Sequence, residues 1–396
     1  MKKTPLILFP LLLVSYEMAT YLANDMYLPA LPQMASDLGV SYHLVQLTLT
    51  LWFLGSGSLQ LLVGPLSDYY GRRPVLLTGG LFFLLSTLVC AFSNDITVLL
   101  IARFVQGTAV CSAIVAGYAA IHESLEQKIA IPTLAWMSSL TVLAPALGPV
   151  IGGLLLQWGN WHSIFILLAL WGGLSIALLF KFMPETNKDG KSKHPIHLKK
   201  ILHNYYLIFA NRSFRAHTLT FCCLFGGFIA WLSAGPFLIV TSFKYSVMMF
   251  TFFQCLIFGA FIIATRLVKI LLNKMKPERL IHIGTSCCLT GAGVAALLSH
   301  WMPESVLGLV IPLMLYGVGG GLSFSPLNRL SAESSDAPMG AKMALFSSGI
   351  SVAGVGASIL VMMMYDGSLA SLSYLMVGLA VLAAVIQWRN FRLNLA

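Results

Sequence analysis

The sequence predicts an all-α integral membrane protein whose twelve transmembrane helices form two six-helix bundles. Of its 396 residues, 58% are hydrophobic and only 10% are charged, and the mean hydropathy is +0.83. A soluble protein of this length would carry roughly a quarter charged residues. Apolar runs of about 20 residues, each long enough to cross a bilayer, recur along the chain. Six of these runs precede a polar stretch near the middle of the chain, and six follow it.

The apolar runs are expected to be helices, because lipid requires every backbone polar group to be hydrogen-bonded within the protein and strand-like alternation is absent. The first run is too long for a secretory signal, contains two acids and lacks a small-residue cleavage site, so it counts as a span. The predicted spans cover residues 7–30, 43–66, 75–93, 96–121, 131–157, 161–182, 216–241, 248–272, 280–300, 304–328, 342–364 and 369–389.

The polar stretch divides the chain into two parts. Residues 183–215 are predicted to form a central cytoplasmic loop between an N-terminal bundle, 1–182, and a C-terminal bundle, 216–396. Two such halves commonly surround a binding site near the membrane midplane. Lysine and arginine concentrate in the even-numbered loops and near both ends of the chain, which predicts that both termini are cytoplasmic. The net charge of +10 is therefore attributed to topology rather than to nucleic-acid binding.

Two acids stand inside the first span, LILFPLLLVSYEMATYLANDMYLPALP. Glu17 and Asp25 are the only carboxylates far from the ends of a predicted span. A charge in hydrocarbon costs a few kcal/mol or more, so such acids predict a functional site. Eight residues of helix correspond to about 12 Å of rise and roughly 80° of rotation, so both acids can face one cavity at different depths. Low-dielectric surroundings favour the protonated carboxyl, and we expect this pair to bind a proton, a cation or both.

The fourth span, IARFVQGTAVCSAIVAGYAAI, contains the one cation placed deep within an apolar run. Arg103 is followed one helical turn later by Gln106. An unpaired arginine at this depth would be costly, so it requires a carboxylate, backbone carbonyls or water. A purely structural arginine satisfied by the backbone is the alternative interpretation.

A loop pattern indicates a family. Between the second and third spans lies GPLSDYYGRRP, in which a glycine permits a tight turn. The spacing GP-x-x-D-x-x-G-R-R resembles the loop signature of the major facilitator superfamily. The resemblance implies a conformational latch, formed by Asp68, Gly71, Arg72 and Arg73, that rearranges during alternating access. Tyr69 departs from the pattern, because a basic residue often follows the aspartate.

Two further patterns are similar to motifs of this superfamily. The R-F-x-Q-G sequence of the fourth span resembles a motif whose arginine is implicated in proton transfer. This implies that Arg103 and Gln106 act in proton coupling, with Asp25 or Glu17 as an indirect partner. The fifth-span sequence LAPALGPVIGG resembles the antiporter motif of the exporting, proton-exchanging branch. Its prolines are expected to kink the helix and its glycines to allow close packing. The residues of this motif are Pro145, Gly148, Pro149, Gly152 and Gly153.

The resemblance to drug/proton antiporters of the superfamily extends over nearly all of the N-terminal half and is fainter in the C-terminal half. It implies that Glu17 and Asp25 are the protonatable, substrate-responsive pair. It also implies a bacterial inner-membrane monomer that moves small molecules, uses the proton gradient, and needs no cofactor, metal or nucleic acid. Trp231, Gln254 and Phe258 could equally pack in the core. The residues implied to line the substrate cavity are Tyr21, Asn24, Tyr118, Met137, Trp231, Gln254 and Phe258.

Several functions fit these patterns. Export of lipophilic, often cationic drugs suits the aromatic residues and 17 methionines, which can form an adaptable apolar pocket. Proton-coupled export of one endogenous metabolite, such as a siderophore, fits the same residues. Proton-driven import is disfavoured by the fifth-span motif. A membrane enzyme or receptor-like binding protein has little support, because no catalytic Ser/His/Asp pattern, phosphate loop or metal-type His/Cys spacing is present.

Overall fold

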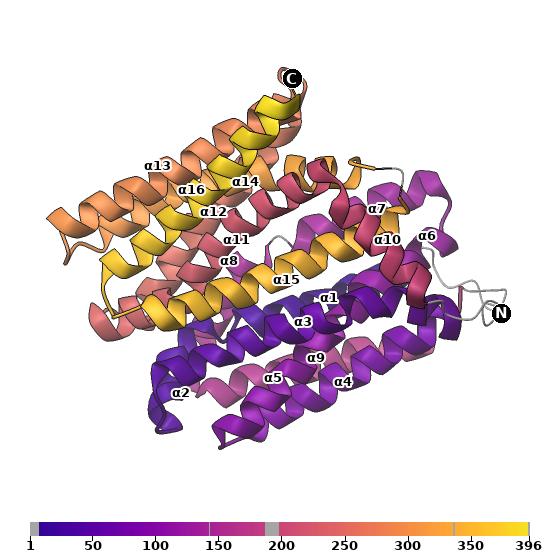
Figure 1. The fold of residues 1–396 in the computed structure, drawn as a ribbon. Coiled ribbons are helices and arrows are strands. Elements are labelled where there is room, and N and C mark those ends of the chain that lie inside the picture. Colours follow the sequence, from indigo (N-terminus) through magenta and orange to yellow (C-terminus); the bar gives the residue numbers. More distant parts are fainter. Residues whose placement is uncertain (1–7, 142, 187–197, 336, 395–396) are drawn as a thin grey trace. The chain divides into compact units, whose positions relative to one another are not determined.

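The computed structural model describes residues 8–141, 143–186, 198–335 and 337–394, and all regular secondary structure in these ranges is helical (Figure 1). The all-α prediction is therefore confirmed. The chain separates into two compact units, Met1–Lys199 and Lys200–Ala396. Each unit has its own packed interior.

The N-terminal unit contains helices in all six of its predicted spans. The first span is shorter than predicted, because α1 ends at Asp25 and a 3-10 turn containing Pro29 follows; proline cannot donate the next helical hydrogen bond. The fourth span is interrupted by a π-helical segment, η2. The fifth span consists of two helices, and Pro145 lies at the start of the second. The elements are α1 (Leu8–Asp25), η1 (Leu28–Ala30), α2 (Leu31–Asp37), α3 (Tyr42–Tyr70), α4 (Arg72–Phe92), α5 (Ile96–Cys111), η2 (Ser112–Gly117), α6 (Tyr118–Ser124), α7 (Gln127–Thr141), α8 (Ala144–Trp158) and α9 (Trp161–Phe182).

The C-terminal unit follows its predicted spans closely and includes one helix that was not expected. Its elements are α11 (Arg212–Pro236), π-helical η3 (Phe237–Ser242), α12 (Val247–Leu272), α13 (Pro277–Trp301), α14 (Leu307–Ala332), α15 (Met339–Met364) and α16 (Leu369–Asn394). The unexpected helix, α10 (Leu198–Ala210), lies within the predicted central loop 183–215. Its 13 residues give a length of about 20 Å, too short to cross a bilayer. It therefore lacks the spanning pattern on which the prediction relied. Leu202, Tyr206 and Phe209 are exposed along it.

Ten of the described helices are long and apolar enough to cross a membrane. The helices of the first and fifth predicted spans are not among these ten. Helix α1 has 18 residues and includes Glu17 and Asp25, and the fifth span is divided between α7 and α8. In α9, Leu170 and Leu174 are exposed at helical spacing, which suits a surface facing lipid.

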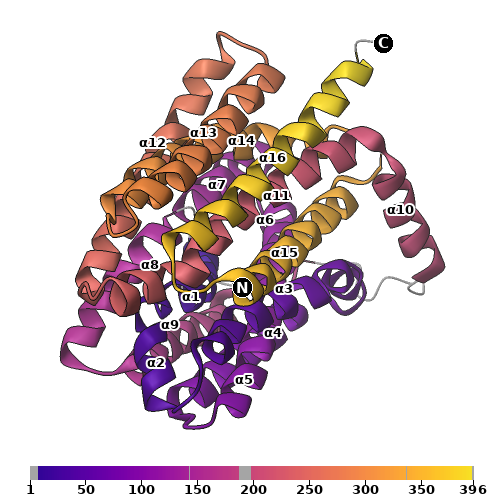
Figure 2. The same ribbon diagram turned by 60° about the vertical axis from the view of Figure 1, so that its left-hand side comes forward.

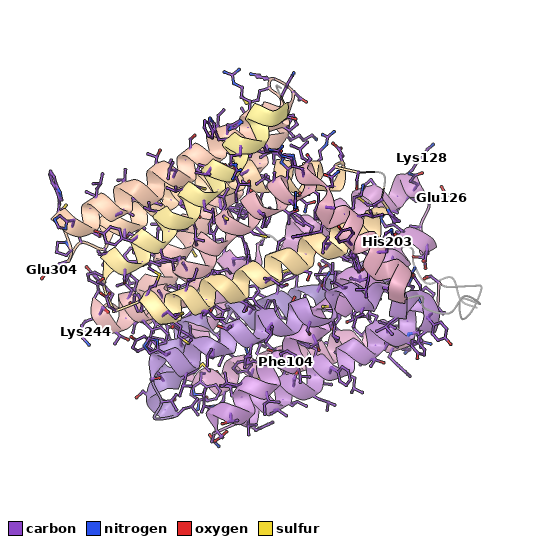
Figure 3. All side chains as sticks on the ribbon, in the orientation of Figure 1. Phe104, Glu126, Lys128, His203, Lys244 and Glu304 are labelled. Carbon is purple, nitrogen blue, oxygen red and sulfur yellow. The ribbon has the colours of Figure 1, made fainter. Side chains whose placement is uncertain are left out.

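Figure 3 shows the ends of the C-terminal bundle. Lys244, between η3 and α12, and Glu304, between α13 and α14, lie at the same end of that unit, whereas His203 of α10 lies at the other. Lys244 and Glu304 are separated by two helices, α12 and α13, so a chain that crosses a membrane with each helix would return to the same side.

Reciprocal glycine contacts fix the crossing of α3 and α5, which lie side by side with α4 (Figures 1 and 2). A Cβ on Gly55 would lie 2.0 Å from the carbonyl oxygen of Phe104, and a Cβ on Gly107 would lie 2.1 Å from that of Trp52. Only glycine permits this backbone approach. The crossing holds Arg103, which precedes Phe104, against Thr48 of α3.

Candidate functional site

Glu17 is buried in the N-terminal unit, with 1% of its surface exposed. The hydroxyl of Tyr118 donates a hydrogen bond of 2.8 Å to its Oε1 atom. Its other oxygen, Oε2, accepts no hydrogen bond from the described residues. Tyr118 begins α6 directly after the π-helical segment. Such segments change which face of a helix a residue occupies and often occur at functional sites. The structure thus joins two residues that were predicted separately, one as proton-coupling and one as substrate-binding.

Asp25 is the last residue of α1 and is 4% exposed. The side-chain amide of Asn24 donates a 3.2 Å hydrogen bond to Asp25 Oδ1, and Asn24 Oδ1 has no partner among the described residues. The two acids therefore occupy different surroundings: a tyrosine hydroxyl binds Glu17, and a neighbouring amide binds Asp25.

The glycines of the predicted antiporter motif pack directly on the end of α1. A Cβ on Gly148 would lie 2.6 Å from the Cβ of Asp25, and one on Gly152 would lie 1.8 Å from the carbonyl oxygen of Met26. Pro149 is also buried in α8. These contacts explain physically why small residues occur at this spacing, because any larger side chain would force α8 away from α1. The motif and the intramembrane acid form one structural feature.

Arg103 is fully buried in α5 and binds backbone carbonyls. Its Nη1 atom donates to the carbonyl of Ala23, at 2.9 Å, and its Nε atom donates to that of Thr48, at 3.4 Å. The guanidinium lies 4.3 Å from the ring centroid of Tyr27, a cation–π arrangement. Nη2 has no partner within the part of the chain that the structure describes. Arg103 therefore ties α5 to α1 and α3, and its α1 contact lies two residues before Asp25.

Gln106 extends this network to α4. Its oxygen accepts a hydrogen bond from Arg103 Nη1, and its nitrogen donates to the hydroxyl of Thr87 over 2.7 Å. Among the described residues, no ion pair within 4.0 Å joins Arg103 to Glu17 or Asp25. The carbonyls anticipated in the alternative interpretation are present, and the guanidinium also binds Gln106.

The remaining predicted substrate residues fall in both units. In the N-terminal unit, Tyr21 is partly exposed one turn after Glu17, and Met137 is fully buried in α7.

In the C-terminal unit, the indole nitrogen of Trp231 donates to Gln254 Oε1 at 2.5 Å, which links α11 to α12. The ring of Phe258 lies 5.5 Å from that of Phe228. All three predicted residues of this unit are buried.

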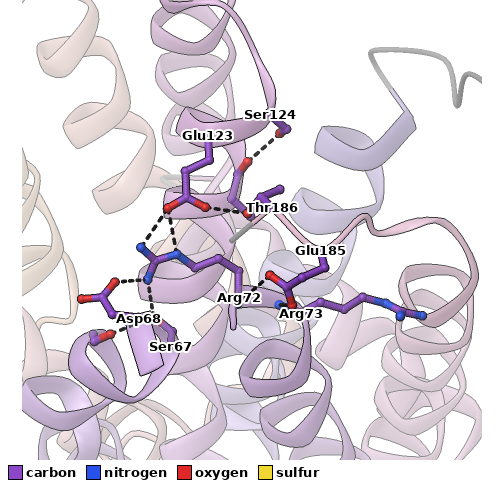
Figure 4. Close-up of polar contacts among 10 residues, drawn as sticks. Ser67, Asp68, Arg72, Arg73, Glu123, Ser124, Glu185 and Thr186 are labelled. Carbon is purple, nitrogen blue, oxygen red and sulfur yellow. Dashed lines mark hydrogen bonds and ion pairs between the residues drawn. The ribbon is translucent and has the colours of Figure 1, made fainter. Parts of the chain in front are cut away.

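The predicted latch is an ion-pair network at the junction of α3 and α4 (Figure 4). Asp68 Oδ1 lies 2.5 Å from Arg72 Nη1. Arg72 also donates through Nε and Nη2 to Glu123 Oε1, at 3.0 and 2.9 Å. Glu123 in turn accepts a 2.6 Å hydrogen bond from the hydroxyl of Thr186. The network therefore joins the ends of α3, α4, α6 and α9 within one unit.

Gly71 allows a third acid, Glu185, to approach the predicted latch residues. Its φ of +102° favours glycine, and a Cβ there would lie 2.6 Å from Glu185 Oε2. Glu185 accepts hydrogen bonds from the backbone nitrogens of Arg72, at 3.1 Å, and Arg73, at 3.2 Å. It thereby caps the first turn of α4, where a negative charge is favourable. Arg73 donates to the carbonyl of Phe180 at 2.6 Å.

Sequence reasoning did not name Glu123, Glu185 and Thr186, which complete the contacts around the predicted latch residues. Their available signal was position, because each lies two to four residues after a predicted span, 96–121 or 161–182, whose end is on the same side of the membrane as Arg72 and Arg73. Position in the sequence predicts that these residues lie on the same side of the membrane as the arginines. It does not predict which of them form hydrogen bonds, because that depends on how closely the helix ends approach.

Comparison with known proteins identifies the family. The model of the Major Facilitator Superfamily matches residues 13–358. The chain belongs to the major facilitator superfamily. It is therefore a multi-pass membrane transporter, and its small-molecule substrates and lipid surroundings follow from that membership.

Curated relatives within this superfamily cover most of the chain. The multidrug transporter MdfA of Yersinia pestis bv. Antiqua (strain Angola) is 33% identical over 88% of this chain and 87% of its own length. The multidrug resistance protein MdtM of Escherichia coli (strain K12) is 31% identical over 84% of this chain and 80% of its own.

Solved structures show the same fold. A D-xylose–proton symporter superposes with a TM-score of 0.78 at 16% identity, covering 96% of this chain and 97% of its own. The human organic anion transporter MFSD10 gives a TM-score of 0.69 at 18% identity, covering 97% of this chain and all (100%) of its own. The predicted major facilitator fold is thus confirmed.

Proposed function

We propose that this superfamily member is a proton-coupled antiporter that exports lipophilic, often cationic drugs by alternating access. One observation carries the proposal: two buried carboxyl groups, Glu17 and Asp25, lie on a single helix beside the buried guanidinium of Arg103, and among the described residues neither acid forms an ion pair within 4.0 Å. Burying acids without an ion-pair partner is costly, and such acids in a membrane protein typically serve to bind and release protons or other ions. The coupling ion would be the proton, so no metal or other cofactor is required.

The surroundings of Glu17 can control whether its carboxyl group takes up a proton. Tyr118 donates a hydrogen bond to one carboxyl oxygen, which favours the charged form, whereas burial favours the neutral form. The second oxygen has no described partner and is free to receive a proton or to interact with a cationic substrate. Opposing influences of this kind allow a change in surroundings to reverse the protonation state.

The transport cycle follows from competition between proton and substrate. In the outward-facing state, Asp25 or Glu17 takes up a proton after the drug has left. In the inward-facing state, that proton is lost as a drug enters. Each ligand shifts the balance of states only by the difference between its affinities for the two states, so exchange requires that proton and drug favour different ones.

Arg103 is proposed to make this exchange sensitive to conformation. It is held by the carbonyl of Ala23, on the same turn of α1 as Asp25. A shift between α1 and α5 would alter the distance between the guanidinium and the Asp25 carboxyl. A nearby positive charge favours the carboxylate, so the shift would change proton affinity.

Drug export is preferred over other transport because the curated relatives described above are named for multidrug transport or resistance. Gly148 and Gly152, in the stretch that resembles the antiporter motif, pack on α1 beside Asp25. This packing supports a shared role for α8 and α1 in exchange. We further propose that the protein lies in the bacterial inner membrane as a monomer, with both termini in the cytoplasm.

Transport into inverted membrane vesicles tests this proposal. Uptake of the lipophilic cation tetraphenylphosphonium and the collapse of an imposed pH gradient would be recorded together. We expect both signals for the natural sequence and their loss in Glu17→Gln and Asp25→Asn. Glu304→Gln is the matched control, because Glu304 is an exposed acid in the loop between α13 and α14. Full pH-driven efflux in both Glu17→Gln and Asp25→Asn would rule out the assigned coupling.

A further inference from the structure

Helix α10 carries an apolar stripe, formed by Leu202, Tyr206 and Phe209, that the described residues leave exposed. Each of the three side chains has more than half of its surface accessible. At 3.6 residues per turn, these positions lie within roughly 60° of one another around the helix, so they form a single surface. Ile208, by contrast, is fully buried. The helix therefore packs on the protein through another face and presents the stripe outward.

The stripe lies next to a helix that is long and apolar enough to cross a membrane. Only Asn211 separates α10 from that helix, α11. The side chain of Asn211 fixes the junction, because its Oδ1 atom accepts a 2.9 Å hydrogen bond from the backbone nitrogen of Phe214 and its Nδ2 atom donates a 3.0 Å bond to the carbonyl oxygen of Ser334. His203 of α10 lies at one end of the C-terminal unit (Figure 3). The helix is thus held at the level where α11 meets the membrane surface.

The charged residues around the stripe are all basic. Lys199 and Lys200 precede it within α10, and two exposed arginines, Arg212 and Arg215, follow it in the first turn of α11. From residue 198 to residue 215 the sequence contains no aspartate or glutamate. An apolar face accompanied by lysine and arginine is characteristic of helices that lie in the membrane interface, and each such cation adds to the attraction toward anionic lipid.

These features select the kind of partner. A second copy of α10 would bring like charges together. A bilayer that contains anionic lipid offers acyl chains to Leu202 and Phe209 and phosphate groups to the cations, and tyrosine is favoured at the boundary between them. We propose that α10 docks on the bilayer surface through Leu202, Tyr206 and Phe209 and there binds the headgroups of an anionic phospholipid such as phosphatidylglycerol.

The docked helix would act on the C-terminal unit through its junction with α11. Arg212 Nη2 donates a 3.3 Å hydrogen bond to the carbonyl oxygen of Arg389 in α16, and Asn211 binds Ser334, just after α14. Docking of α10 would therefore hold the ends of α14 and α16 at the membrane surface. None of the residues assigned above to transport or to the latch takes part, so the lipid contact is separate from the proposed drug–proton exchange.

Hydrogen–deuterium exchange of the purified full-length protein in nanodiscs tests the proposal. A helix of 13 residues is marginal by itself, so slow exchange of its amides reports docking. We expect the amides of residues 202–210 to exchange about tenfold or more slowly in discs that contain phosphatidylglycerol than in discs of phosphatidylcholine alone. Amides of α13 should exchange equally in both kinds of disc. This comparison uses the natural sequence and does not depend on the folding of any variant.

Two double variants separate the apolar contribution from the charge. Tyr206→Ser/Phe209→Ser should exchange rapidly in both kinds of disc, because it removes two of the three apolar contacts. Lys199→Gln/Lys200→Gln should reduce the difference between the two lipids to about twofold or less. Natural exchange rates in α13 would show that each variant is folded.

The matched control is Lys274→Gln/Lys276→Gln, which neutralises two exposed lysines between α12 and α13 and should keep the full lipid difference. Equal exchange of α10 in the two kinds of disc would overturn the proposal and favour a protein as the partner of the stripe. An undiminished lipid difference in the α10 lysine variant would also overturn it, as would slow exchange that persists in the serine variant.

Discussion

Replacing Gly152 with alanine should force α8 away from the end of α1 and impair transport. The new Cβ would lie 1.8 Å from the carbonyl oxygen of Met26, whereas ordinary contacts begin near 3.4 Å. The helices must therefore separate by about 1.6 Å, the difference between these two values. The obstacle is backbone rather than a flexible side chain, so rotamer changes cannot relieve it. Overpacking of this kind costs about 1–3 kcal/mol.

A matched substitution separates this packing effect from helix propensity. Gly293→Ala also places alanine within a long helix, α13, but its Cβ would meet nothing within 4 Å. That change should be neutral or stabilise by up to about 1 kcal/mol, because alanine favours helix over glycine. Thermal unfolding in detergent would measure both variants, with a Tm change of about 2–4 °C for each kcal/mol. Drug efflux would be measured in parallel. If Gly152→Ala matched Gly293→Ala in both assays, the close packing of α8 on Met26 would be refuted.

Three further substitutions probe the network around the acids and the latch. Arg103→Ala should abolish turnover and proton release on drug addition, because it removes the link from α5 to Ala23; a normal proton-release signal would contradict this. Tyr118→Phe should shift drug-driven proton release to higher pH, since the Glu17 carboxylate loses a hydrogen bond that favours its charged form. An unchanged pH profile would show that the bond has no role in coupling. Asp68→Asn should slow conformational cycling more than it weakens drug binding, while the free energy of unfolding changes by less than about 1 kcal/mol, because the Asp68 side chain is exposed and Arg72 keeps its ion pair with Glu123. A larger loss of affinity than of turnover would argue against the latch.

Much of the fold could be predicted from the sequence because the membrane limits the choices. Apolar length identified where helices occur, and each predicted span contains helix in the structure. The errors arose where a local feature counts more than hydropathy. Pro29 follows the early end of α1, and the 13-residue α10 is too short to give a spanning signal.

Contacts at the candidate site were harder to predict than its residues. Glu17, Tyr118 and Arg103 were all named as candidates from the sequence, but their partners depend on how the helices cross. Arg103 binds the backbone carbonyls of Ala23 and Thr48. Every residue has a backbone carbonyl, so no residue type in the sequence identifies these acceptors. The contact between Tyr118 and Glu17 follows a π-helical segment that standard helical spacing does not anticipate.

The central claim is that Glu17 and Asp25 exchange protons for drug. Proteoliposomes loaded with a pH-sensitive dye would report proton movement while drug transport is measured on the same sample. We predict that drug addition drives proton flux with the natural sequence and with Glu304→Gln, and that the double variant Glu17→Gln/Asp25→Asn shows neither flux nor uphill drug transport. Drug-driven proton flux persisting in the double variant would contradict the account.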